Sequence, residues 1–121
     1  MIDREARNKL AEEIRHFLTG LSDNIDFDKA AFEIKTEDKT VLEIREQMWH
    51  TYEDFFRYKL KGKYVLPDKH IQLIKRLNMF LKTDFECAKF NKHTDFNMWP
   101  FKNKEEFDFA NNNPIYLRTA T

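Results

Sequence analysis

The residues best placed to do chemistry are His50 and Glu53, because an imidazole titrates near neutral pH and both groups can bind a metal. Their spacing of three residues puts both side chains on one face of a helix, as some metal sites require. A catalytic zinc usually takes three ligands from the protein. The candidates for a third ligand are His70, His93, Cys87 and Asp84. We favour a solvated helix face with local salt bridges, and the metal site stays open as the alternative.

Other signatures of catalysis are absent from the sequence. It contains no HExxH or GxSxG pattern, and its two glycines, Gly20 and Gly62, cannot build a glycine-rich phosphate loop. Cys87 with His93 is a conceivable nucleophile pair, but a lone cysteine among aromatic residues is more typical of an inert, buried side chain. The sequence therefore predicts no catalytic residue, no bound metal and no cofactor.

A cluster of aromatic residues in the last third of the chain is the best candidate for function. Phe96, Trp99 and Phe101 lie close together in the sequence, and large aromatic side chains dominate interface hot spots when they are exposed as a group. We name these three residues as a candidate interaction surface. The alternative, which we weigh more heavily, is that they only fasten the tail onto the protein, because scattered aromatic residues usually bury.

Composition limits the partners that such a surface could bind. The 121 residues include 21 basic and 21 acidic side chains, so there is no cationic excess of the kind that nucleic-acid binding normally requires. No apolar run is long enough to span a bilayer, and no secretory signal is visible. One cysteine cannot form an internal disulfide. We therefore expect a cytoplasmic protein that binds a protein partner or its own copy, and neither nucleic acid nor a membrane.

Hydrophobic periodicity predicts helices over most of the chain. Apolar residues recur at helical spacing over 3–19, where Gly20 is placed to end the helix, over 25–32, and over 67–82, where Pro67 fits the first turn. Asn103 can cap a short helix through Ala110.

The strongest helical pattern covers 37–60, with Thr36 as its cap and an i,i+4 pair of Glu53 and Arg57 on its surface. Its apolar stripe includes Val41, Ile44, Met48, Tyr52, Phe55 and Phe56.

These elements predict a mainly α fold in one domain, residues 1–121. We expect a small three- to four-helix bundle over about 3–82, covered by an aromatic-rich and largely irregular C-terminal wrap over about 83–121. Small β-pieces near 115–117 are compatible with the sequence.

Several stretches resemble a family of small uncharacterised bacterial cytosolic proteins, over about residues 3–86. The similar stretches are Asp3-Arg4-Glu5-Ala6-Arg7-Asn8, Asn24-Ile25-Asp26-Phe27-Asp28, Trp49-x-x-Tyr52-x-Asp54, Lys59-Leu60-x-Gly62 and Phe80-Leu81-Lys82-Thr83-Asp84-Phe85-Glu86. In this family an aromatic–Pro pair tends to follow directly after the acidic element, whereas Trp99-Pro100 comes well downstream here. The resemblance implies a helical fold in a bacterial cytosol, without an established activity.

The same resemblance draws attention to Trp49, Tyr52 and Asp54 as a structural or functional cluster. Their spacing fits a buried aromatic pair that a carboxylate ties down. Our leading functional hypothesis is a non-catalytic protein-interaction or accessory module. The alternative is a metal-dependent or small-ligand enzyme that uses His50 and Glu53 with a distant His or Cys.

Overall fold

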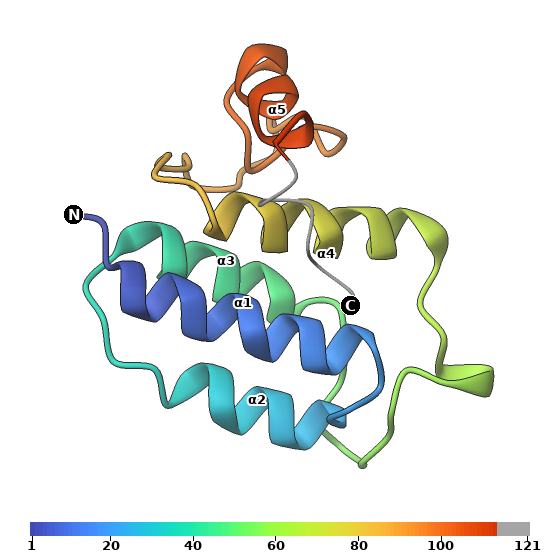
Figure 1. The fold of residues 1–121 in the computed structure, drawn as a ribbon. Coiled ribbons are helices and arrows are strands. Elements are labelled where there is room, and N and C mark those ends of the chain that lie inside the picture. Colours follow the sequence, from blue (N-terminus) through green and yellow to red (C-terminus); the bar gives the residue numbers. More distant parts are fainter. Residues whose placement is uncertain (114–121) are drawn as a thin grey trace.

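The computed structural model describes residues 1–113, and helices make up nearly all of the regular structure (Figure 1). Five α-helices and no strand occur in this part of the chain. They are α1 (Arg4–Leu18), α2 (Asn24–Phe32), α3 (Lys39–Trp49), α4 (Asp68–Leu81) and α5 (Lys104–Asn111), with a 3-10 turn η1 (Gly62–Tyr64) between α3 and α4. The predicted mainly α fold is confirmed. The β-pieces expected near 115–117 lie outside the described residues.

The first four helices form the bundle. α1 contacts α2, α3 and α4, while α5 contacts α4 from the side that faces away from α2 (Figure 1). The irregular segment 82–103 leaves the end of α4 and leads back to α5 on the side of α4 that faces away from α2 (Figure 1). This is the predicted arrangement of a small bundle with a largely irregular C-terminal cover.

Four of the five α-helices begin with a side chain that accepts a hydrogen bond from a backbone N–H two or three residues further on. The capping residues are Asp3, Asp23, Asp38 and Asn103. Such a cap stabilises a helix by about 1 kcal/mol. The cap predicted at Asn103 is confirmed, whereas the one at Thr36 is wrong. The Thr36 hydroxyl instead donates to Oδ2 of Asp3, at 2.7 Å.

Gly20 ends α1 as the sequence predicts. Its φ of +81° lies in the left-handed region that favours glycine. A Cβ at this position would come within 2.7 Å of Cε of Lys61, but this flexible side chain can move away, so the backbone conformation and not the space calls for glycine. The end of α1 is thus in contact with the segment that connects α3 to α4.

The centre of the bundle is apolar, and each helix contributes to it at helical spacing. Leu10, Ile14 and Phe17 of α1 are fully buried. They belong to one cluster of buried side chains with residues from the other helices, among them Ile44, Met48, Ile74, Leu77 and Phe80. Burying one such side chain contributes about 1.5–3 kcal/mol, so this shared core is the main source of stability.

A fully buried ion pair joins the start of α1 to the start of α3. The guanidinium of Arg7 donates to both carboxylate oxygens of Asp38, at 2.7 and 3.3 Å, and neither side chain is exposed to solvent. Arg7 also donates to the carbonyl oxygens of Thr83 and Phe85, at 3.0 and 2.6 Å. Because these carbonyls follow the end of α4, a single arginine holds three segments together.

The helix predicted over 37–60 is wrong at both ends, and most of all at its C-terminal end. α3 starts at Lys39 and stops at Trp49, and residues 50–61 are turns and irregular backbone. The predicted pair of Glu53 and Arg57 does not form. Arg57 instead donates to the carboxylates of Asp23 and Asp26, at 2.6 and 3.1 Å.

Candidate interaction surface

The connection between α3 and α4, residues 50–67, is here called the aromatic loop. The side chain of Asn24, the first residue of α2, holds its backbone in place. Nδ2 of Asn24 donates to the carbonyl oxygens of Glu53 and Phe56, at 2.6 and 2.8 Å, and its Oδ1 accepts from the backbone N–H of Tyr58, at 2.7 Å. Asn24 is fully buried, so breaking any of these hydrogen bonds would leave a buried polar group without a partner. The loop is therefore fixed to the bundle by contacts distant in sequence.

Tyr52 anchors the start of the aromatic loop in the core. Its ring packs edge-on against Phe17 and Phe27, with centroids 5.6 Å from each. Its hydroxyl donates to Oδ1 of Asp28 in α2, at 2.7 Å. Burial and the hydrogen bond to Asp28 together raise the pKa of Tyr52 above its ordinary value, so the phenol stays neutral and acts as a fixed anchor.

Beyond this anchor the loop presents large aromatic side chains to solvent. Phe55 is 89% exposed and Phe56 is 49% exposed, and Trp49, at the end of α3, is 43% exposed. An exposed ring does not gain the free energy that burial of its apolar surface would provide. These side chains therefore contribute little to the stability of the fold. A rigid backbone that exposes aromatic side chains has the features of a binding surface.

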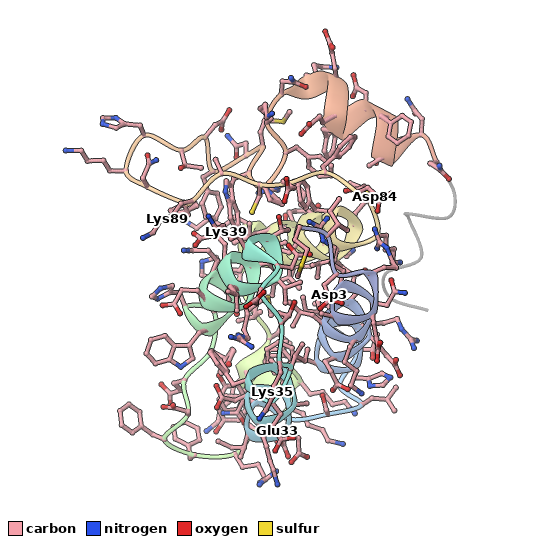
Figure 2. All side chains as sticks on the ribbon, turned by 90° about the vertical axis from the view of Figure 1, so that its left-hand side faces the viewer. Asp3, Glu33, Lys35, Lys39, Asp84 and Lys89 are labelled. Carbon is pink, nitrogen blue, oxygen red and sulfur yellow. The ribbon has the colours of Figure 1, made fainter. Side chains whose placement is uncertain are left out.

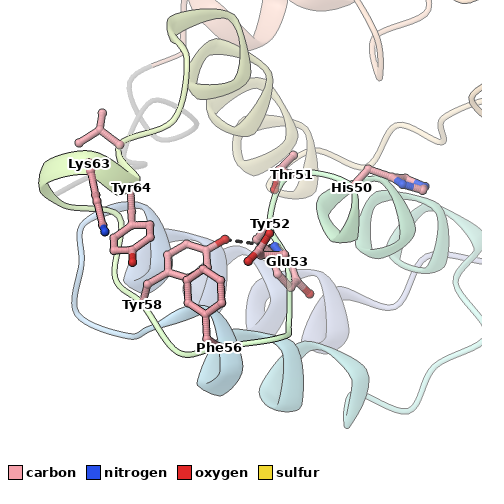
Figure 3. A pocket seen from close by; sticks show the side chains of 9 residues that line it. His50, Thr51, Tyr52, Glu53, Phe56, Tyr58, Lys63 and Tyr64 are labelled. Carbon is pink, nitrogen blue, oxygen red and sulfur yellow. Dashed lines mark hydrogen bonds between the residues drawn. The ribbon is translucent and has the colours of Figure 1, made fainter.

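A shallow pocket of about 410 Å³ lies beside these rings (Figure 3). Tyr58 and Tyr64 stack with their centroids 4.7 Å apart, and Nζ of Lys63 lies 5.2 Å from the ring centre of Tyr64. Figure 3 shows these side chains and Phe56 gathered at one end of the pocket, with the hydroxyl of Tyr58 accepting a hydrogen bond from the backbone of Glu53. The pocket offers stacking faces and one lysine, which suits recognition more than catalysis.

The structure separates the predicted cluster of Trp49, Tyr52 and Asp54. Tyr52 is held by a carboxylate, as the spacing suggested, but the hydrogen-bonded carboxylate belongs to Asp28 of α2. The ring of Trp49 is partly exposed and contacts His50, not Tyr52. Asp54 is exposed. The expected buried aromatic pair is therefore wrong, because the chain leaves the helix after Trp49.

Trp99 and Phe101 are buried, at 4% and 3% exposure, so they do not form an exposed docking patch. The indole N–H of Trp99 donates to the carbonyl oxygen of Ala88, at 2.9 Å. Phe101 packs edge-on against Phe80 of α4, and Phe96 is half-buried in the same region. The alternative interpretation therefore holds for Trp99 and Phe101: they fasten the C-terminal segment to α4.

The residues considered for metal chemistry do not converge. Among residues 1–113, no group of three or more His, Cys, Asp and Glu side chains lies close enough to hold a metal ion. His50 and His70 do line one pocket of about 390 Å³ together with Trp99, but Glu53 and Cys87 do not line it.

Cys87 is not arranged as a nucleophile. Burial raises the pKa of its thiol to about 11, so the thiolate is scarce at neutral pH. His93, the proposed partner, is exposed in the segment that follows.

Comparison with models of known protein families, with curated proteins and with solved structures finds no match. None of the helices in residues 1–113 has the length and apolar character needed to cross a membrane. The site must therefore be interpreted from its own geometry.

Sequence reasoning missed the aromatic loop because Phe55 and Phe56 fit the helical stripe of the preceding residues. Residues 49–58 contain no glycine or proline that would mark the end of a helix, so no local signal identified the loop.

Proposed function

We propose that this protein is a non-catalytic protein-interaction module and that the aromatic loop is its contact surface. The proposal rests on a loop whose backbone is fixed while its rings are exposed. Asn24 holds the backbone by three hydrogen bonds, and the side chains of Phe55 and Phe56 are exposed to solvent. A surface that is already ordered loses little conformational entropy when it binds. Exposed phenylalanines with neighbouring tyrosines supply the anchors that hot spots use.

Charge supports the same proposal. The loop carries cations next to its rings, but Glu53 and Asp54 precede them and Arg57 is already paired with Asp23 and Asp26. A surface with charges of both signs suits a protein partner. Nucleic acid would instead require an extended cationic groove for its phosphate backbone. The setting in a bacterial cytosol belongs to this proposal, and it is supported by the sequence resemblance and by the absence of disulfide-forming cysteine pairs.

The test is capture of partners from a lysate of the native host with immobilised protein. Wild type is compared with the double variant Phe55→Ser/Phe56→Ser, whose folding we expect to be intact because the first ring is almost fully exposed and the second half exposed. The matched control is Phe109→Ser, which removes another exposed ring on α5, at 56% exposure. We expect the loop variant to lose captured protein that wild type and the control retain.

Two outcomes would contradict the proposal. Equal capture by all three proteins would show that the aromatic loop is not the contact surface. Loss of capture in the α5 control but not in the loop variant would move the surface to the other end of the molecule. Circular dichroism of each variant establishes that the fold is unchanged.

A further inference from the structure

Basic side chains gather in the second part of the aromatic loop, whereas acidic side chains are in excess at the start of the chain. Residues 55–67 contain four basic side chains and no acidic one: Arg57, Lys59, Lys61 and Lys63. The chain as a whole has equal numbers of acidic and basic residues, so an acidic excess must lie elsewhere. It lies at the start, where residues 1–38 contain ten acidic and six basic side chains.

A groove between α1 and α2 lies within this acidic part. Its volume is about 740 Å³, within the range of about 300–1,000 Å³ that is typical of pockets for compact ligands. Ala6, Ala30 and Ile34 supply its apolar lining, and the small alanines leave room between the helices. Such a groove can accept one or two aromatic rings.

The groove's acidic side chains lie around this apolar lining. Glu5 and Glu33 are exposed, and Glu12 is about half exposed. Of the two lysines that line the groove, Lys9 already pairs with Glu13, at 3.0 Å, and Lys35 is exposed. Figure 2 shows Asp3, Lys35 and Glu33 on the side of the molecule where α1 begins.

The aromatic loop and the groove lie at opposite ends of α1 (Figure 1). The groove extends along the first turns, from Asp3 to Glu12, whereas the loop contacts Gly20 just after the helix. With a rise of 1.5 Å per residue, the eight residues from Glu12, at the near end of the groove, to Gly20 span about 12 Å. Asn24 holds the loop at this end, and Phe55 is 89% exposed, so the loop does not fill the groove of its own chain.

We propose that the partner of the aromatic loop is the α1–α2 groove of a second copy of this chain. Phe55 and Phe56 enter the apolar groove, and Lys59, Lys61 and Lys63 face its acidic border. This contact joins two different surfaces, so a pair of copies still has one free loop and one free groove, and further copies add head to tail. The inference rests on the proposed function of the loop and names its partner.

Sedimentation velocity of the purified protein tests this contact. We expect the mean mass of the wild type to rise across roughly a hundredfold range of concentration, and to fall when salt screens the charges. The loop variant Phe55→Ser/Phe56→Ser and the groove variant Glu5→Lys/Glu33→Lys should each weaken self-association at least tenfold.

Mixing the two variants provides the decisive comparison. The groove variant keeps an intact loop and the loop variant keeps an intact groove, so together they should form a one-to-one dimer that neither forms alone. The variant Lys89→Glu, which changes an exposed charge outside both surfaces, is the control and should assemble as the wild type does.

Three results would overturn the inference. A wild type that remains monomeric at every concentration excludes self-association, and the proposed function then still stands if the loop captures another protein from the lysate. Assembly that the groove variant retains would show that the loop docks elsewhere. Salt-sensitive, loop-dependent binding of the monomer to single-stranded oligothymidine or to phosphatidylglycerol vesicles would assign the loop to an anionic partner of another class.

Discussion

Replacing Arg7 by Met tests the buried ion pair that joins the starts of α1 and α3. Met keeps most of the aliphatic volume, but it removes the donors to Asp38 and to the carbonyl oxygens of Thr83 and Phe85. Because both charged side chains are fully buried, the variant leaves the Asp38 carboxylate without its cation. Breaking such a pair by removing one partner costs about 3–5 kcal/mol.

This loss is large compared with the whole stability of a small protein, about 5–15 kcal/mol. With a urea m-value of about 2 kcal/mol/M, a loss of 4 kcal/mol lowers the unfolding midpoint by about 2 M. The control is Lys9→Met on the same helix, whose partly exposed pair with Glu13 should contribute at most about 1 kcal/mol. Far-ultraviolet circular dichroism in urea measures both variants.

The pH dependence gives a second check. Burial alone would raise the pKa of Asp38, but the hydrogen bonds from Arg7, Asp3 and Thr40 and the charge of Arg7 outweigh it, so the pKa lies below its ordinary 3.8. In the wild type, Asp38 therefore contributes stability that is present above pH 3.8 and is lost as pH falls through the lowered pKa. Without Arg7, burial loses its strongest opposing contributions, so we expect the pKa of Asp38 to rise and protonation at low pH to relieve the buried charge.

The difference in stability between wild type and Arg7→Met should therefore be largest at neutral pH and shrink toward pH 3. Adding Asp38→Asn to the variant should recover part of the loss at neutral pH, because it removes the unpaired charge and keeps an oxygen that caps α3. A loss no greater than that of Lys9→Met, or one that does not change with pH, would refute this account of the ion pair.

Three further predictions follow from other contacts. Trp99→Ala should lower the unfolding free energy by about 3–5 kcal/mol in urea, because the side chain is buried; an unchanged midpoint would contradict its place in the core. Asn24→Ala should destabilise the protein by about 1–3 kcal/mol and speed amide hydrogen exchange at Tyr58, and slow exchange there would show that other contacts hold the loop. Cys87 should react with iodoacetamide far more slowly at pH 8 than the same thiol in urea, because a pKa of about 11 leaves about one thiolate in a thousand; equal rates would contradict its burial.

The sequence predicted the helices whose signals are local. α1 combines an apolar stripe with a C-terminal Gly20, and α5 begins at a capping Asn103, so short-range patterns decide both. These elements were predicted to within two residues. The mainly α fold follows from them.

The end of α3 could not be predicted because distant contacts decide it. The pattern of Tyr52 and Phe56 continues a helical stripe, yet the side chain of Asn24 binds backbone groups of residues 53–58 that a longer helix would have used itself. The ring of Tyr52 packs against Phe17 of α1 and Phe27 of α2. Tertiary packing thus overrides a local periodicity.

The candidate surface was misplaced for the same reason. A sequence gives the types of aromatic residues but not which of them the fold buries, so Phe55 and Phe56 were assigned to the apolar stripe of a helix and Trp99 and Phe101 to the candidate surface. In the structure the first pair is core and the second is exposed.

The most direct measurement is photo-crosslinking in living host cells with benzoylphenylalanine in place of Phe55, compared with the same probe in place of Phe109. Our account predicts a specific adduct from the loop position and none of comparable yield from α5, because the loop, and not α5, belongs to the contact surface. An adduct of twice the chain's mass that maps to the α1–α2 groove would establish head-to-tail pairing, and an adduct of another mass would name a different protein partner. No adduct at position 55, or a stronger one at position 109, would contradict the claim that this protein works through its aromatic loop.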